Sequence, residues 1–445
     1  MTGHRTSAAE IGHRTSAADT TITDVRLTPV LIADPPLLNV QGVHQPYVPR
    51  LIVEVETEGG IVGVGETLGD TTYLEIARQL GPALVGRRTT ETNRLPAMAS
   101  GAADVDAGAL SSPTDAAGFR GAPDAGKLRL SVISAFEVAM LDALGKATGL
   151  PVHALLGGKV RDSVEYSGYL FYRWAEHPQD DAPRDDWGAA LDPAGIVEQA
   201  RRFHREHGFT SFKLKGGVFP PDEEAAAIRA LAEAFPDSPL RLDPNGGWSV
   251  DTSLKVAAEL TGVLEYLEDP TTSTPGMAQV HEASGMPLAT NMCVTRLGEI
   301  PEAFTKDAVQ VVLSDHHYWG GLRATKELAA ICGAFGVGVS MHSNTHLGVS
   351  LAAMTQVAAT VPNLDYACDT HRPWQTDDVI TEPHVFREGR IEVTDTPGLG
   401  IELDRDALAV LHERWLARPS MRDRDDEAGM RLVDPQWTPH SSPRW

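Results

Sequence analysis

From about residue 160, short apolar segments alternate regularly with helical patterns along the chain. The segments of strand type are SFKLK, PLRLD, LEYLED, PLATN, VVLSD and VGVSMHS, and the helices between them include DEEAAAIRALAEAF and SVDTSLKVAAEL. Alternating β and α units predict an α/β fold with a parallel sheet. At least six units recur at intervals of 23 to 28 residues, which favours a (β/α) barrel over an open sheet.

Each of these six strands ends in an ionisable or strongly polar residue. In chain order they are Lys215, Asp243, Glu268, Asn291, Asp315 and His342. Taken singly, such residues are ordinary turn residues or helix N-caps. In a TIM barrel, however, the carboxyl ends of the strands converge on the active site. Six polar strand ends in phase therefore indicate a catalytic centre.

The chemical types at the strand ends indicate a metal site between two bases. Asp243, Glu268 and Asn291 offer oxygen ligands from consecutive strands, which suits Mg²⁺. Zinc is disfavoured, because its usual Cys/His ligand set is missing. Lys215 precedes this group along the chain and His342 follows it, and an Asp on the strand before a His is typical of a base and the group that orients it.

Lys213 lies two positions before Lys215, so a strand places both ammonium groups on one face. Two like charges repel, and each makes it easier for the other to lose its proton. We therefore interpret one lysine as a base and the other as the group that activates it and binds a substrate oxygen. This layout suits removal of a proton from carbon beside a carboxylate, where a divalent cation stabilises the enediolate charge.

The N-terminal part of the chain has a different rhythm. Residues 20–66 alternate in strand style, and LIVEVETEGGIVGVGE (51–66) predicts a hairpin. Residues 96–126 read as a long loop, and SVISAFEVAMLDALGKATG (131–149) predicts a helix. The near-repeat GHRTSAAE and GHRTSAAD predicts a disordered extension over residues 1–20.

Taken together, these motifs resemble the enolase superfamily, and within its mandelate racemase-like barrel group the D-glucarate dehydratases. The matching stretches are FKLKGGV, LRLDPNGGW, EYLEDP, ATNMCVT, LSDHHYWGGL, SMHSNTHLGVS and CDTHRPWQ, with GVHQPYVPR and RDRDDEAGM nearer the ends. The likeness runs from about residue 25 to the C-terminus. The KxK pair and the three oxygen ligands are typical of the superfamily, whereas LSDHHYWGG and MHSNTHLG are more specific to glucarate dehydratases.

The resemblance implies a modified (β/α)7β TIM barrel with an N-terminal α+β capping domain. The expected divisions are 21–155 for the cap, 156–395 for the barrel and 396–445 for a C-terminal segment that returns to the cap. The resemblance further implies a keto-deoxy-glucarate as product, made from D-glucarate or L-idarate with Mg²⁺.

The resemblance also assigns roles to individual residues. Lys215 would be the base on one face, and His342, paired with Asp315, the base on the other face and the acid that helps hydroxide leave. Mg²⁺ would be held by Asp243, Glu268 and Asn291. Asn245 and Asn344 would polarise substrate oxygens. The remaining substrate contacts would come from Lys213, His44, Tyr169, His371 and Arg424.

Three alternatives remain open at this point. The chain could dehydrate another diacid sugar such as galactarate, it could be an epimerase, or it could be a weakly active relative that partners a true dehydratase. The stretch GFRGAPDAGKLRL (118–130) departs from the family pattern. Cap loops touch the distal end of the substrate, so this departure bears on substrate preference and not on the acid/base residues.

Composition narrows the class of partner. The formal net charge of −23 argues against nucleic acid and anionic membranes. No stretch approaches the roughly 20 apolar residues of a membrane span, the N-terminus lacks the apolar core of a secretory signal, and three scattered cysteines form no disulfide framework. We therefore expect a cytoplasmic enzyme with a small acid-sugar substrate, and the resemblance adds a homo-oligomer.

Overall fold

The computed structural model describes residues 20–100, 125–440 and 442–445. Almost all of the predicted N-terminal extension lies outside the described residues, as does most of the predicted 96–126 loop and the first part of the divergent 118–130 stretch. In the described part of the chain, no helix is both long and apolar enough to cross a membrane.

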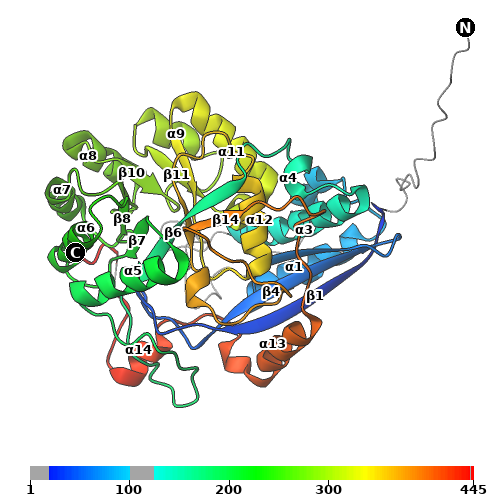
Figure 1. Cartoon of the computed structure of the whole chain (residues 1–445), viewed down its shortest axis with the longest axis horizontal. Coiled ribbons are helices and arrows are strands. Elements are labelled where there is room, and N and C mark those ends of the chain that lie inside the picture. Colours follow the sequence, from blue (N-terminus) through cyan, green and yellow to red (C-terminus); the bar gives the residue numbers. More distant parts are fainter. Residues whose placement is uncertain (1–19, 101–124, 441) are drawn as a thin grey trace, which may run out of the picture.

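Eight parallel strands form a nearly closed barrel (Figure 1). They are β6 (Ser163–Phe171), β7 (Phe212–Lys215), β8 (Leu240–Asp243), β9 (Tyr266–Glu268), β10 (Leu288–Thr290), β11 (Val311–Ser314), β12 (Gly338–Met341) and β13 (Cys368–Thr370). Hydrogen-bonded neighbours follow the order β12-β11-β10-β9-β8-β7-β6-β13, and a bridge between Val339 and Leu364 connects the two ends. The predicted barrel is confirmed.

Helical connections cover the outside of the barrel. They are α5 (Pro193–His207), α6 (Pro221–Ala234), α7 (Val250–Glu259), α8 (Thr274–Ser284), α9 (Ile300–Thr305), α11 (Leu322–Phe335) and α12 (Gly348–Ala358), whereas the short α10 (His316–Trp319) lies at the carboxyl end of β11. Helix α5 shows how the sequence sets their limits. Asp192 accepts a hydrogen bond from the Gly195 amide at 2.8 Å, and Gly208 ends the helix with φ +73°.

The N-terminal cap is an antiparallel sheet backed by helices. Strands β1 (Ile22–Ala33), β4 (Tyr47–Thr57) and β5 (Val62–Leu68) pair in that order, and β4 and β5 form the predicted hairpin. Helices α1 (Thr71–Leu84), α2 (Leu95–Ala99) and α3 (Ala125–Thr148) complete the cap, with α4 (Val152–Leu155) leading to the barrel. A Cβ at Gly65 would collide with the backbone oxygen of Ala135 on α3, so this glycine permits close packing of strand and helix.

The predicted loop over residues 96–126 is wrong at both of its described ends. Helix α2 extends to Ala99, and α3 begins at Ala125, six residues before the predicted start. The cause is apolar periodicity that continues upstream. Buried residues recur at helical spacing along α3: Leu128, Val132, Ala135, Phe136 and Ala139.

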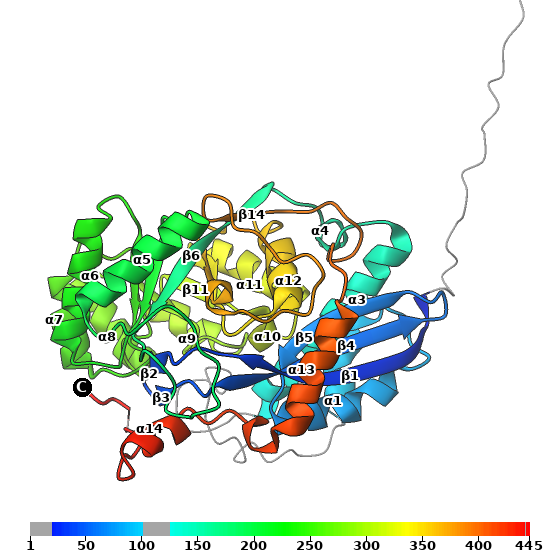
Figure 2. The same ribbon diagram turned by 60° about the horizontal axis from the view of Figure 1, so that its bottom comes forward.

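The C-terminal segment returns to the cap (Figure 2). After β14 (Arg390–Glu392) pairs antiparallel with β6, α13 (Arg405–Ala417) lies against β1. The hairpin β2 (Leu38–Asn39) and β3 (Gly42–Val43) contacts the segment before α14 (Ala428–Val433), where the Val43 amide donates to the Asp426 carbonyl at 3.0 Å. The last residues contact the barrel, because the Ser249 amide donates to the Trp445 carbonyl.

Candidate active site

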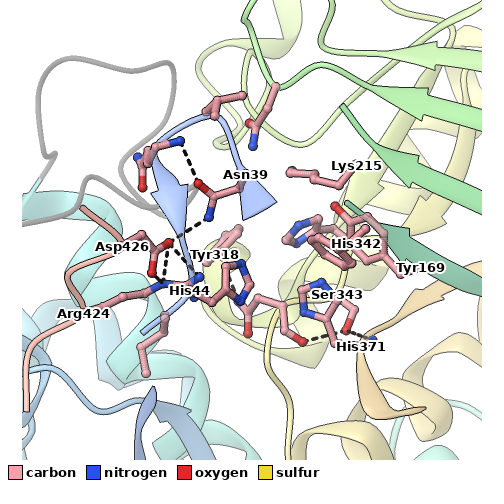
Figure 3. Close-up of a pocket in the computed structure, with 16 residues that line it drawn as sticks. Asn39, His44, Tyr169, Lys215, Tyr318, His342, Ser343, His371, Arg424 and Asp426 are labelled. Carbon is pink, nitrogen blue, oxygen red and sulfur yellow. Dashed lines mark hydrogen bonds and ion pairs between the residues drawn. The ribbon is translucent and has the colours of Figure 1, made fainter. Parts of the chain in front are cut away.

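A cavity opens at the carboxyl ends of the barrel strands, facing the β2–β3 hairpin and the C-terminal segment. Eight of the predicted site residues line it together: His44, Tyr169, Lys215, Asn245, His342, Asn344, His371 and Arg424. Figure 3 shows Lys215, His342 and Tyr169 on the barrel side, with Asn39 on the hairpin and Arg424 and Asp426 on the C-terminal segment. The strand ends therefore meet residues from distant parts of the chain.

The two lysines of β7 face the same point, as predicted. Their Nζ atoms lie 4.6 Å and 5.9 Å from the ring centroid of Tyr169 on the neighbouring strand β6. Lys215 Nζ donates to Asp243 Oδ2 at 2.7 Å, and Lys213 Nζ lies 3.6 Å from the same oxygen. Lys215 lines the cavity, whereas Lys213 is fully buried beneath it.

Lys213 is surrounded by carboxylates. Its Nζ lies 2.6 Å from Glu268 Oε2 and 2.7 Å from Asp369 Oδ2. Burial lowers the pKa of Lys213, but the charges of Asp369 and Glu268 outweigh burial and raise this pKa overall. Lys213 is therefore a cation that compensates buried negative charge. A contact between Lys213 and substrate stays a prediction.

The predicted metal ligands form a cluster of buried oxygens. Burial, and then repulsion from Asp243, raise the pKa of Glu268 well above its usual value. Among the described residues, neither the Oδ1 nor the Nδ2 atom of buried Asn291 has a hydrogen-bond partner. The backbone N–H of Asn291 does donate to Asp269 Oδ2, at 2.8 Å. An unpartnered amide oxygen and two buried carboxylates at the ends of three neighbouring strands are ligand types that suit a hard divalent cation such as Mg²⁺.

His342 has the carboxylate partner that the sequence predicts. Its Nδ1 lies 3.2 Å from Asp315 Oδ2, and the other carboxylate oxygen of Asp315 accepts from the backbone amide of His317 at 2.9 Å. Burial raises the pKa of Asp315, but His317, through its charge and its hydrogen bond, and His342 lower this pKa well below its usual value. Asp315 therefore stays ionised and can orient the imidazole of His342.

Aromatic and amide groups lie beside the predicted bases Lys215 and His342. The ring of Tyr318 stacks on His342 with centroids 5.7 Å apart, and Asn344 Nδ2 donates to the Tyr318 hydroxyl at 2.9 Å. Asn245 follows β8 with φ +55°, a backbone conformation that asparagine tolerates. Its backbone N–H donates to Asp243 Oδ1 at 2.9 Å. Asn245 and Asn344 thus occupy fixed positions on the cavity wall.

The far side of the cavity carries charged groups from the cap and the C-terminal segment. His44 Nδ1 lies 2.9 Å from Asp34 Oδ2, which fixes the ring orientation. Arg424 Nε donates to both carboxylate oxygens of Asp426 at 3.0 and 3.1 Å. On the barrel side, His371 stacks on Tyr169 with centroids 4.6 Å apart.

Comparison with known proteins identifies the family. A model of the enolase C-terminal domain-like family matches residues 195–407, and a model of the mandelate racemase / muconate lactonizing enzyme N-terminal domain matches residues 19–157. The chain belongs to the enolase superfamily. A relative from Streptomyces coelicolor, named probable glucarate dehydratase, is 67% identical over 429 residues, which is 96% of this chain and 99% of that relative.

Solved structures of enolase-superfamily proteins share the whole fold. A protein from Thermobispora bispora complexed with magnesium and formate has a TM-score of 0.90 at 51% identity, covering 96% of this chain and 100% of that one. A protein from Pseudomonas fluorescens with bound magnesium, potassium and tartrate has a TM-score of 0.90 at 45% identity, covering 96% and 99% of the two chains. The predicted superfamily is therefore confirmed.

Several residues that lie at the site of this enolase-superfamily chain were not predicted from its sequence. Asp369 pairs with Lys213 and lies 3.4 Å from the guanidinium of buried Arg241. Tyr318 and Asp426 line the cavity. All three lie within sequence motifs that pointed to the site, CDTHRPWQ, LSDHHYWGG and RDRDDEAGM, so the motifs gave a signal for them. Their partners were not, because those partners come from other elements.

Proposed function

We propose that the chain is a Mg²⁺-dependent dehydratase of six-carbon diacid sugars that converts D-glucarate and L-idarate to a keto-deoxy-glucarate. One observation carries this proposal. Lys215 and His342 line the same cavity from β7 and from the end of β12, which lie across the barrel from each other. Two bases on opposite sides of one cavity suit two acids that are epimeric at the reacting carbon.

The three buried oxygen donors Asp243, Glu268 and Asn291 would hold the metal ion. Magnesium bound there would supply positive charge beside the substrate carboxylate and so make the adjacent C–H bond more acidic. The unpartnered Asn291 oxygen supports this assignment. The relatives solved with magnesium are consistent with it.

The proton steps are assigned to residues of the chain. On one face, Lys215 takes the α-proton; on the other, His342 takes it. The electrons of the broken C–H bond then form a C=C bond as the C–O bond to the β-hydroxyl breaks. Protonated His342 gives its proton to the departing hydroxide, which leaves as water, and the enol product becomes a keto acid.

The other cavity residues would bind the rest of the substrate. Asn245 and Asn344 would donate to substrate oxygens near the reacting carbon. The distal hydroxyls and carboxylate would meet His44, Tyr169, His371 and Arg424, which line the cavity. On this proposal residues 21–155 act as the cap, 156–395 as the catalytic barrel, and 396–445 complete the substrate site from the C-terminal side.

A product assay tests the proposal. Purified protein is incubated with Mg²⁺ and, separately, with D-glucarate, L-idarate and galactarate, and α-keto acid is measured. We expect keto acid from glucarate and idarate, none from galactarate, and none after chelation of the metal. Product from galactarate alone would overturn the substrate assignment. Interconversion of glucarate and idarate without keto acid would indicate an epimerase.

A further inference from the structure

A buried ion pair of the cap reaches into the barrel. Arg50 on β4 and Glu66 on β5 are both buried, and Arg50 Nε and Nη2 each lie 2.8 Å from Glu66 Oε1. Neither residue lines the cavity. A buried charged pair is costly to desolvate, so it indicates a role beyond cap stability.

Glu66 contacts the chain that follows the predicted base His342. Its Oε1 accepts from the Leu347 amide at 2.9 Å, and its Oε2 accepts from the Ser350 amide at 2.8 Å. These amides lie at the start of α12, a few residues after His342. The carboxylate of Glu66 therefore fixes the position of this loop relative to the cap.

Side-chain contacts continue from Ser350 to the base. Ser350 Oγ lies 3.0 Å from His317 Nε2, and His317 Nδ1 lies 2.8 Å from Asp315 Oδ1. The second oxygen of Asp315 lies 3.2 Å from His342 Nδ1. One continuous set of hydrogen-bonding contacts thus joins the cap to the imidazole.

Arg50 contacts the same region by a second route. Its Nη1 donates to Asn344 Oδ1 at 3.4 Å. Asn344 Nδ2 donates to the hydroxyl of Tyr318, whose ring stacks on His342. The two routes meet at His342. We call the whole set of residues the His342 support network: Arg50, Glu66, Ser350, His317, Asp315, His342, Tyr318 and Asn344.

We infer that the Arg50–Glu66 pair is a positioning device that the cap supplies for the His342 face of the reaction. This inference rests on the proposed function. A group held by contacts on two sides keeps its atoms in the geometry that proton transfer needs, and a displacement of about 1 Å can cost on the order of 100-fold in rate. Loss of the pair should therefore slow proton removal by His342 more than proton removal by Lys215.

Lys215 is held by contacts outside the His342 support network. Its Nζ donates to Asp243, and the loop after it is fixed by Glu224 of α6, which accepts from the amides of Gly217, Val218 and Phe219 at 2.8 to 3.0 Å. The two faces thus have separate supports. A change that only weakens the fold would slow both faces alike.

The test compares the two faces in one variant. D-Glucarate and L-idarate are each incubated in D2O with Mg²⁺, and loss of the proton at their epimeric carbon is followed by NMR, which counts both exchange and dehydration. The His342→Ala variant identifies the acid whose proton lies on the His342 face. In Glu66→Gln, we expect the ratio of His342-face to Lys215-face rates to fall about 10- to 100-fold.

Two further variants keep the test decisive. Glu224→Gln removes an equally buried carboxylate that lies outside the His342 support network. In this variant the ratio of His342-face to Lys215-face rates should not fall. Ser350→Ala removes the hydroxyl that contacts His317 with little change of volume, and the ratio should fall even if Glu66→Gln does not fold.

The outcomes separate this inference from the proposed function. Wild-type protein that removes neither proton would overturn the proposed function, and the inference with it. Wild-type protein that removes both protons, together with an unchanged face ratio in Glu66→Gln and Ser350→Ala, would overturn the inference alone.

Discussion

Asn291 differs from the other polar side chains at the strand ends, because neither of its side-chain polar atoms has a hydrogen-bond partner among the described residues. Burial of an unsatisfied amide costs about 1–3 kcal/mol. Its backbone is nevertheless fixed by Asp269, which has φ +37°, an uncommon backbone conformation for aspartate. The unsatisfied side-chain amide is explained if Asn291 coordinates a cation.

We predict that Asn291→Ala weakens Mg²⁺ binding about 100-fold, since loss even of an outer-shell partner costs 10- to 100-fold. Isothermal titration calorimetry with Mg²⁺ alone measures this affinity without any substrate. Asn344→Ala is the matched control, because Asn344 is also an asparagine just beyond a barrel strand, lines the cavity and is not an expected ligand. Equal loss of affinity in both variants would contradict the assignment of Asn291 as a ligand.

Site residues were predictable wherever the strand period alone places them. Lys215, Asp243, Glu268, Asn291, Asp315 and His342 follow from the ends of six strands, and the structure brings these ends together. Contacts between distant elements were not predictable. The pairing of Lys213 with Asp369 joins residues 156 positions apart, and no local pattern encodes it. The same holds for Glu66 and the start of α12.

At the scale of elements, one carboxylate joins the cap helix α3 to the barrel helix α11. Glu137 Oε2 accepts from the Leu322 amide at 2.5 Å, at the N-terminus of α11. A Cβ at Gly321 would collide with this carboxylate, so the glycine admits it. The contact caps one helix with a side chain from another element.

Glu137 predicts a dependence of stability on pH. Burial raises the pKa of Glu137 to about 7, although the backbone hydrogen bonds of Leu322 and Arg323 oppose the shift. The folded protein therefore holds this proton more tightly than the unfolded chain does. Its contribution to stability is complete below about pH 4.5 and is lost as pH rises towards 7, by up to about 3 kcal/mol.

Denaturant unfolding of wild-type protein and Glu137→Gln between pH 4.5 and 8 measures this contribution. The free energy of unfolding of the wild type should fall relative to that of Glu137→Gln as pH rises to 7, and the difference should stay constant above. Parallel curves would show that Glu137 does not titrate in this range.

Elements with a clear hydrophobic period were predicted correctly, whereas the residues at which they begin and end were predicted less well. The barrel strands and the β4–β5 hairpin agree with the structure, because alternation and Gly-rich turns are local signals. Helix α3 begins earlier than predicted, since Gly126 and polar neighbours hid the apolar repeat that starts at Leu128. Part of the intervening segment lies outside the described residues.

At the scale of the whole molecule, three distant parts of the chain meet at one cavity. The barrel supplies Lys215 and His342, the two proposed bases, the cap supplies His44 and the β2–β3 hairpin, and the C-terminal segment supplies Arg424. A chain with a net charge of −23 needs local positive charge to bind a dianion, and Arg424 and the proposed metal would provide it. Cap and C-terminal segment therefore both contribute residues to the wall of this cavity.

The central claim is that one cavity holds two bases on opposite sides of the same carbon. The most direct test is loss of the epimeric proton of D-glucarate and L-idarate in D2O, compared among wild type, Lys215→Ala and His342→Ala. We predict that each variant fails on one acid and still removes the proton of the other. Two variants that lose both acids equally, or that lose neither, would contradict the claim.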